Sequence, residues 1–279
     1  MILPVLIFIF IVVVVVALSY TYENNTHQYV LLDDGEVLNI EGYNRISETP
    51  SSDRLHSFLL KQFHYYKILE ESDQQKFRDR LQVLLKNKWF IAKDGLELHD
   101  VMILFICASM VQITFGLKEF TFPRFNKIAL FPDTFYSGMI EREVKGLTVY
   151  HSGLVIMSWP HAYDGHVNPT DKVNLILHEM AHALYLDYFG NRRMLFGFDE
   201  WQEKANSEFE SMARYEEHPF LRNYAGANIH EFWAVCIEHF FEAPQEFRKQ
   251  LPELYRAMSK ILNQDIAARI DQLKAASTV

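Results

Sequence analysis

The pattern of apolar and polar positions divides the chain into an apolar start, a polar stretch and a longer mixed region. Residues 2–18 form an unbroken apolar run without a charged side chain, close to the lower length limit for a membrane-spanning helix. Residues 21–53 are mostly polar and end in Pro-Ser-Ser-Asp, which combines a helix breaker with capping residues. The pattern predicts a transmembrane anchor over 1–20, a polar tether over 21–53 and one folded domain over 54–279.

A cleaved signal peptide is the alternative to an anchor for the apolar start. A basic region before the apolar run is missing, the run is longer than usual, and Val16-Ala17-Leu18 is a poor cleavage site. We therefore expect a single-pass membrane protein. The side of the membrane on which the folded domain lies stays open, because no Lys or Arg occurs before Arg45.

Apolar residues then recur at helical spacing. Residues 55–69 and 74–85 carry them among charged neighbours, which predicts two amphipathic helices that pack on a core. Residues 98–115 are almost entirely apolar and raise the alternative of a second membrane span. Asp100, with a serine and a glutamine further along, favours a buried core helix there.

Three short segments after this helix have the composition of strands. Residues 127–131, 147–150 and 154–159 are rich in β-branched and aromatic side chains and are separated by turn formers, which predicts a small sheet. From Asp171 onward helical patterns dominate to the end of the chain. The expected fold class is therefore α+β and predominantly helical, preceded by one N-terminal transmembrane helix.

Composition and charge limit the functions that the domain can have. Hydrophobic residues make up 49% of the chain, which is enough for a buried core. The net charge of -9 argues against nucleic acid as a partner, because phosphates would be repelled. Cys107 and Cys236 have neither the spacing of a metal clip nor that of a disulfide scaffold, so we expect both to pack in the core.

The clearest chemical motif is His178-Glu179-Met180-Ala181-His182, within an apolar helical stretch that Thr170 or Asp171 can cap and Gly190 can close. Residues four apart lie above one another on a helix, so His178 and His182 can offer two imidazoles to one metal ion. Glu179 lies off that line, where its carboxylate can reach a water molecule instead of the metal. The stretch predicts a metal site.

A third protein ligand must come from another part of the chain, because a catalytic zinc ion usually takes three. A later apolar helix, residues 228–241, carries Glu231 and Glu238 two turns apart on nearly one face. From the residues alone, Glu231 is either a ligand or a capping carboxylate beside Asn228. Glu238 is either a hydrogen-bond partner of a ligand histidine or a solvated carboxylate.

Several further motifs accompany these two helices in a defined order between residues 59 and 247. They are Lys88-Trp89-Phe90, Gly95-Leu96-Glu97-Leu98, Ile128-Ala129-Leu130-Phe131-Pro132, Val155-Ile156-Met157-Ser158-Trp159 and, after the HExxH helix, Glu231-Phe232-Trp233-Ala234-Val235 with Glu238 and Phe240-Phe241 behind it. In this order the motifs resemble the Mlc titration factor A family of zinc-dependent peptidases, which is distantly similar to the catalytic domain of anthrax lethal factor.

The resemblance implies a zincin-like (gluzincin) metallopeptidase domain with a small β-sheet and one Zn²⁺ per chain. It implies that His178, His182 and Glu231 are the metal ligands and that Tyr224 faces the site. No role is carried over to Asp187, because the residues after the second histidine depart from the family pattern. The expected membrane anchor is a second departure, and it leaves open whether a repressor such as Mlc is a partner.

The expected activity is hydrolysis of peptide bonds in a peptide or protein substrate. Glu179 would accept a proton from water, Tyr224 would stabilise the oxyanion, and the strand at 154–159 could pair with an extended substrate. The alternatives are a zinc-containing regulatory module that binds a protein partner and cleaves little, or an interaction module with a vestigial site. His161, His166, His230 and His239 lack ligand spacing, so we expect surface or packing roles for them.

Overall fold

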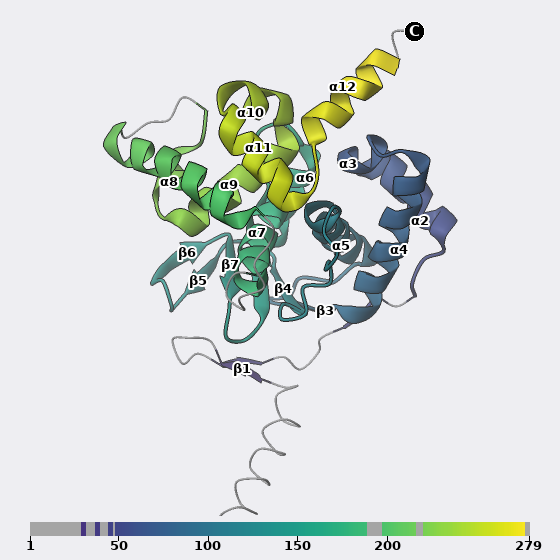
Figure 1. Cartoon of the computed structure of the whole chain (residues 1–279). Coiled ribbons are helices and arrows are strands. Elements are labelled where there is room, and N and C mark those ends of the chain that lie inside the picture. Colours follow the sequence, from purple (N-terminus) through teal and green to yellow (C-terminus); the bar gives the residue numbers. More distant parts are fainter. Residues whose placement is uncertain are drawn as a thin grey trace, which may run out of the picture.

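A four-stranded sheet and the helices that cover it form the frame of the molecule (Figure 1). The computed structural model describes residues 29–31, 37–39, 44–46, 48–188, 197–215 and 220–276. Its strands are β1 (Tyr29–Leu31), β2 (Val37–Asn39), β3 (Trp89–Ala92), β4 (Lys127–Phe131), β5 (Phe135–Ser137), β6 (Arg142–Val144), β7 (Gly146–Val149) and β8 (Leu154–Ser158). Its helices are α2 (Ser52–Gln62), α3 (His64–Lys67), α4 (Glu71–Asn87), α5 (Asp100–Thr114), α6 (Trp159–Val167), α7 (Leu175–Tyr188), α8 (Phe198–Tyr215), the 3₁₀ turn η1 (Asn223–Gly226), α9 (Ile229–Glu242), α10 (Pro244–Gln250), α11 (Pro252–Leu262) and α12 (Ile266–Ala276).

The main sheet has the strand order β3-β4-β8-β7. Strands β3, β4 and β8 are parallel, whereas β7 runs antiparallel to β8 and forms one edge. Strands β5 and β6 make a separate antiparallel pair, as do β1 and β2. The three segments that the sequence assigned to a small sheet are thus β4, β7 and β8, and the mostly helical α+β class is confirmed.

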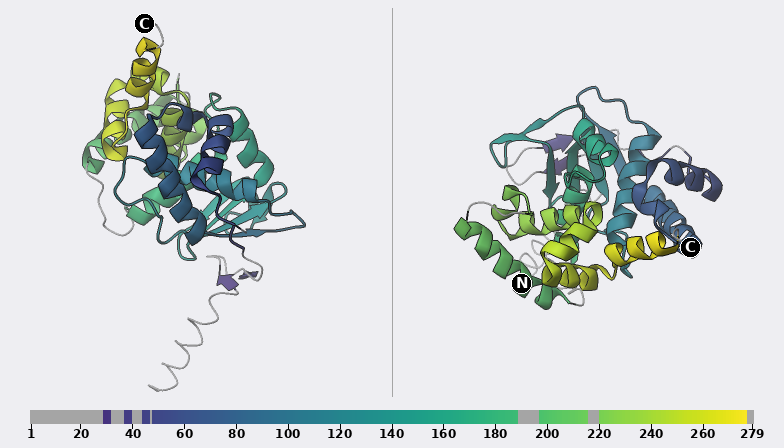
Figure 2. Two further views of the ribbon diagram at one scale, coloured as in Figure 1. Left: turned by 90° about the vertical axis from the view of Figure 1, so that its right-hand side faces the viewer. Right: turned by 90° about the horizontal axis from the view of Figure 1, so that it is seen from above.

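Both faces of the two central strands, β4 and β8, are buried, which explains why they read as nearly continuous apolar runs. Ile128 of β4 and Val155 of β8 belong to the large core shared with the helices. Their neighbours Ala129 and Ile156 point to the other face and pack in a small second core with Phe135 of β5. Most helices therefore lie on one side of the sheet, as the left view of Figure 2 shows.

Helix α5 lies inside the helical layer, and its residues 102–114 are all buried. This confirms a core helix in place of a second membrane span. The 15 residues of α5 rise only about 22 Å, less than the roughly 30 Å of a bilayer's hydrocarbon layer.

The expectation of a single-pass membrane protein is contradicted. Across the described ranges, no helix combines the length and the apolar character that a membrane crossing requires. The anchor expected over 1–20 lies outside the described residues. The expected localisation at a membrane is therefore corrected.

Helix α7 begins later than the sequence suggested. Asp171 caps only a turn, since its Oδ1 accepts from the Val173 amide, and Lys172 has φ +65°. Asn174 provides the cap instead, because its Oδ1 accepts from the Leu177 amide. The expected closing residue Gly190 lies outside the described residues.

Candidate metal centre

Two adjacent helices bring three ligand-type side chains together. His178 and His182 lie one turn apart on α7, and Glu231 lies in the first turn of α9. The two helices are held by packing and by a hydrogen bond of 2.9 Å from Trp233 Nε1 to the Ala181 carbonyl. Asn228 caps α9 by accepting from the Glu231 amide, so the Glu231 carboxylate is available to the histidines. One ligand atom from each of the three residues lies within 4.8 Å of the others.

The spacing of these atoms suits a tetrahedral ion. His178 Nε2 lies 3.0 Å from Glu231 Oε2 and 3.2 Å from His182 Nε2, and His182 Nε2 lies 3.4 Å from Glu231 Oε2. Ligands about 2.05 Å from a tetrahedral zinc ion are about 3.3 Å apart. The three observed separations bracket that value, so the residues fit a zinc ion without rearrangement.

The protonation of His178 supports the same conclusion. Its Nδ1 lies 3.1 Å from Glu238 Oε2, a carboxylate that can only accept, so Nδ1 carries a proton and Nε2 is the nitrogen that faces Glu231 and His182. Two imidazole nitrogens and a carboxylate oxygen thus converge at one point, where a metal ion can replace the proton that Nε2 carries without it. Burial lowers the pKa of His178, but hydrogen bonds to Glu231 and Glu238 outweigh it and raise that pKa to about 10. Burial raises the pKa of Glu231, and its bonds to the two histidines more than reverse this shift.

Glu238 is a buried hydrogen-bond partner of the metal centre, with 1% of its surface exposed. Besides His178, its carboxylate accepts from the Asn174 backbone amide at 2.8 Å and from the Arg222 guanidinium. Contacts of this kind hold a ligand imidazole in one orientation. Of the two interpretations that the sequence left open for Glu238, the structure supports this one.

Glu179 points toward β7 and is not part of the ligand group. The Thr148 hydroxyl lies 2.8 Å from Glu179 Oε2 and 3.1 Å from the Glu179 carbonyl oxygen. On the same strand, a Cβ added to Gly146 would stand only 2.2 Å from Glu179 Oε1. The carboxylate is therefore held against β7, with room made by a glycine. Burial raises the pKa of Glu179, and the nearby histidines lower it in part, so the group has a stronger affinity for protons than an ordinary carboxylate.

Tyr224 lies in η1, directly before α9. Its ring centroid is 5.9 Å from that of His178, and 43% of its surface is exposed. Burial and then the Glu231 carboxylate raise the pKa of Tyr224, so the phenol keeps its proton at neutral pH. Tyr224 therefore lies beside the metal centre, partly exposed, with a phenol that can donate a hydrogen bond.

The remaining histidines and cysteines lie outside the ligand group. His239 is buried and its ring nitrogens face the carbonyls of Val235 and Phe220. His161 pairs with Ser158. Cys107 and Cys236 are buried free thiols, as expected.

One expectation about the substrate path is wrong. The strand at 154–159 is β8, whose two edges are already paired with β4 and β7. An extended peptide cannot add to it. Strand β7 lies beside Glu179 and has one edge with which no described strand pairs.

Sequence reasoning also missed four residues around the site: Asn174, Arg222, Thr148 and Gly146. Asn174 carried a usable signal, since asparagine just before an apolar helical stretch is a typical cap. Thr148 and Gly146 carried none, because their contact with Glu179 spans about 30 residues of chain.

The sequence of this chain is similar to those of several known proteins. The chain is 27% identical to an uncharacterized protein of Synechocystis over 222 residues, which cover 70% of this chain and 78% of that protein. It is 24% identical to Mlc titration factor A of Serratia proteamaculans over 74% of this chain and 86% of the relative, and 24% identical to that of Pectobacterium atrosepticum over 72% and 83%. The model of the glucose-regulated metallo-peptidase M90 family matches residues 39–262. The chain therefore belongs to this metallopeptidase family, which includes the Mlc titration factor A proteins that its sequence resembles.

Proposed function

We propose that this protein is a zinc-dependent peptidase that hydrolyses peptide bonds with water. The observation that carries the proposal is the arrangement of three converging ligand-type atoms at tetrahedral spacing beside a buried carboxylate that is not one of them. A protein that used metal only for stability would have no need of Glu179 in that position. His178, His182 and Glu231 would hold the ion.

Each residue of the site has a task in this reaction. A zinc ion supplies Lewis acidity, which makes water a usable nucleophile near neutral pH. Glu179 accepts the proton of the attacking water and passes it to the leaving amine, a task suited to its raised pKa. Tyr224 donates a hydrogen bond to the oxyanion of the tetrahedral intermediate. Glu238 keeps His178 oriented through Nδ1.

The substrate class follows from the edge of the sheet. Strand β7 offers main-chain groups next to Glu179, so an extended peptide that pairs with it would pass the metal centre. The substrate is therefore a peptide or an unfolded protein segment.

The test compares zinc-loaded wild-type protein with Glu179→Gln on denatured casein and a diverse peptide library. The amide keeps the shape but removes the base, so hydrolysis should fall at least about a hundredfold while zinc content and thermal stability stay unchanged. Glu253→Gln, an exposed change on α11, is the matched control and should keep full activity. If fully zinc-loaded wild-type protein cleaves nothing, the alternative of a zinc-containing binding module replaces the peptidase.

A further inference from the structure

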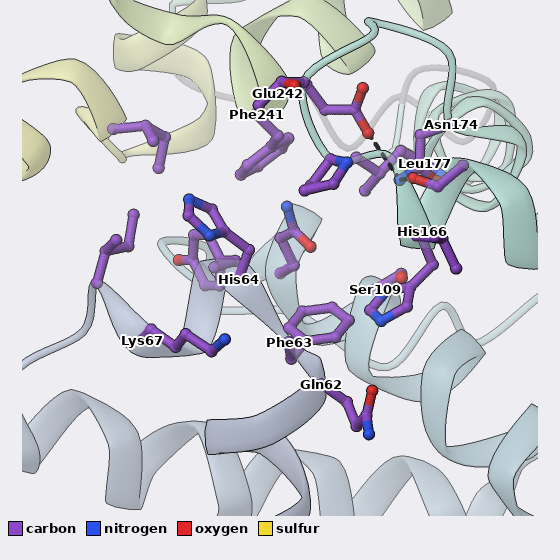
Figure 3. Close-up of a pocket in the computed structure, with 18 of the residues that line it drawn as sticks. Gln62, Phe63, His64, Lys67, Ser109, His166, Asn174, Leu177, Phe241 and Glu242 are labelled. Carbon is purple, nitrogen blue, oxygen red and sulfur yellow. Dashed lines mark hydrogen bonds between the residues drawn. The ribbon is translucent and has the colours of Figure 1, made fainter.

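A cavity of about 410 Å³ lies at the start of α7 and the end of α9, apart from the three metal-binding residues. Its walls come from helices distant in sequence: α3, α5, α6, α9 and α12 each contribute side chains (Figure 3). None of His178, His182 and Glu231 lines it. The cavity is large enough for an amino acid or a dipeptide.

Two polar side chains of the core line this cavity. Ser109 and Gln112 interrupt the otherwise apolar helix α5 and are only 4% and 8% exposed. Both line the cavity, and within the described part of the chain neither side chain makes a hydrogen bond. Buried polar groups are costly unless they are hydrogen-bonded. Through the cavity these two side chains are reached by solvent, and they can hydrogen-bond to polar groups of an occupant.

Charge is distributed unevenly along the cavity. Glu242, at the end of α9, is the only carboxylate among the lining residues and is 8% exposed. Its Oε1 accepts from Asn174 Nδ2 at 2.9 Å. Lys67 lies at the opposite end in Figure 3, and Lys61 also lines the cavity. One end thus suits a cation, whereas the other suits an anion.

Two histidines of the lining do not change this distribution at neutral pH. Burial, and then Lys67, lower the pKa of His64, and burial lowers the pKa of His166. Burial raises the pKa of Glu242 to about 8, although the bond from Asn174 opposes this shift. A cation beside Glu242 would favour its ionised form and gain a buried ion pair.

Apolar side chains also line the cavity, among polar ones such as Gln62 and Thr170. They are Phe63, Leu177, Phe241, Ile266 and Ile270. An occupant with an apolar side chain can therefore bury it against them.

We propose that this cavity binds a small zwitterion, a free amino acid or dipeptide with an apolar side chain. Its ammonium group lies against Glu242, its carboxylate lies toward Lys67, and Ser109 and Gln112 hydrogen-bond the polar groups between them. A longer peptide does not fit, since the volume limits the occupant to about two residues.

The bound zwitterion contacts the metal centre indirectly. Asn174 holds Glu242 with its side chain and Glu238 with its backbone amide at 2.8 Å, and Glu238 holds His178. An ammonium group that pairs with Glu242 changes the position of Asn174. Asn174 in turn positions Glu238, which holds His178. Short peptides, the products of peptide hydrolysis, would then regulate the metal centre from a separate site. This regulation rests on the proposed function, whereas binding of the zwitterion to the cavity does not.

Saturation-transfer NMR on the zinc-loaded protein tests the binding, with L-leucine and L-leucyl-L-leucine as probes. N-acetyl-L-leucine and L-leucine amide lack one charge each and should bind at least about tenfold more weakly. Comparison of L-leucine with L-leucyl-L-leucine shows whether the cavity prefers a free amino acid or a dipeptide, because both carry the same two charged groups. Mass spectrometry after each run shows whether the dipeptide is still intact.

Variants locate the bound probe. Glu242→Gln and Lys67→Gln should each weaken binding about tenfold. Gln112→Leu should do so without loss of thermal stability, because its side chain makes no hydrogen bond with another described residue. Lys86→Gln, an exposed change on α4, is the control and should bind normally. Glu179→Gln should also bind normally, which separates this cavity from the metal centre.

Three results would overturn the proposal. The first is that neither L-leucine nor L-leucyl-L-leucine binds at millimolar concentration, and the second is that the two singly charged analogues bind as tightly as L-leucine. The third is binding that survives Glu242→Gln and Gln112→Leu but is lost when zinc is removed. A protein without peptidase activity that still binds L-leucine would contradict only the proposed function. If a saturating concentration of the bound zwitterion leaves the rate of peptide hydrolysis unchanged, the proposed regulation of the metal centre is wrong.

Discussion

A single methyl group on β7 should disable the proposed general base. In Gly146→Ala the new Cβ would stand 2.2 Å from Glu179 Oε1, 2.7 Å from Cδ and 2.8 Å from Cγ. Ordinary contacts of a Cβ begin at 3.4 Å, so the carboxylate must move by roughly 1 Å. A misplacement of that size can cost a catalytic group about a hundredfold in rate. This corresponds to about 2.7 kcal/mol of transition-state stabilisation.

The assay is kcat/KM on a quenched fluorescent peptide, together with zinc content by mass spectrometry. Zinc should stay stoichiometric, because the ligand residues lie on α7 and α9 and are not displaced. Gly226→Ala is the matched control, since nothing lies within 4 Å of its added Cβ. Thr148→Val should cost about two- to tenfold through the lost hydrogen bond, and Thr148→Ser should restore the rate. A Gly146→Ala enzyme within twofold of wild type would refute the idea that β7 positions Glu179, and loss of zinc would show that the glycine serves the fold.

Three further predictions concern the ligands, the oxyanion donor and the buried acid. Glu231→Ala and His182→Ala should each lose most of the zinc in a dialysed sample; full retention in both would exclude this ligand set. Tyr224→Phe should cost about 2–4 kcal/mol in transition-state stabilisation, seen mainly in kcat, and a change confined to KM would argue for substrate contact instead. Burial raises the pKa of Glu242 from 4.5 to about 8, so at intermediate pH the native state keeps a proton that the unfolded state loses. The contribution of Glu242 to the free energy of unfolding is therefore complete below pH 4.5 and is lost as the pH rises through 8. Glu242→Gln should therefore gain stability relative to wild type between pH 5 and pH 8, by a few kcal/mol in urea unfolding, and equal differences at both pH values would contradict the shift.

Local patterns in the sequence were sufficient for much of the fold. Helices α4 and α5 and strands β4, β7 and β8 were predicted close to their observed positions, because periodicity and side-chain type reflect burial directly. Helix starts were less certain, since several adjacent residues can cap. Asp171 and Asn174 are both good caps by type, and only the contact of Asn174 with α9 selects the second.

What the sequence by itself determined is the part of the chemistry that depends on spacing along one helix. His178 and His182 share a face of α7 whatever surrounds it, because residues four apart are neighbours in any α-helix. The third metal-binding candidate needed more, since Glu231 lies about 50 residues away and was chosen over a capping role only through the family resemblance.

Tertiary structure alone decided the contacts that cross between elements. It placed Glu238 behind His178, Thr148 and Gly146 against Glu179, and β7 at the edge of the sheet in place of β8. It also gathered Ser109, Gln112 and Glu242 around one cavity. Such contacts depend on strand order and on helix packing, which are set by the burial of the whole core and leave no local period in the sequence.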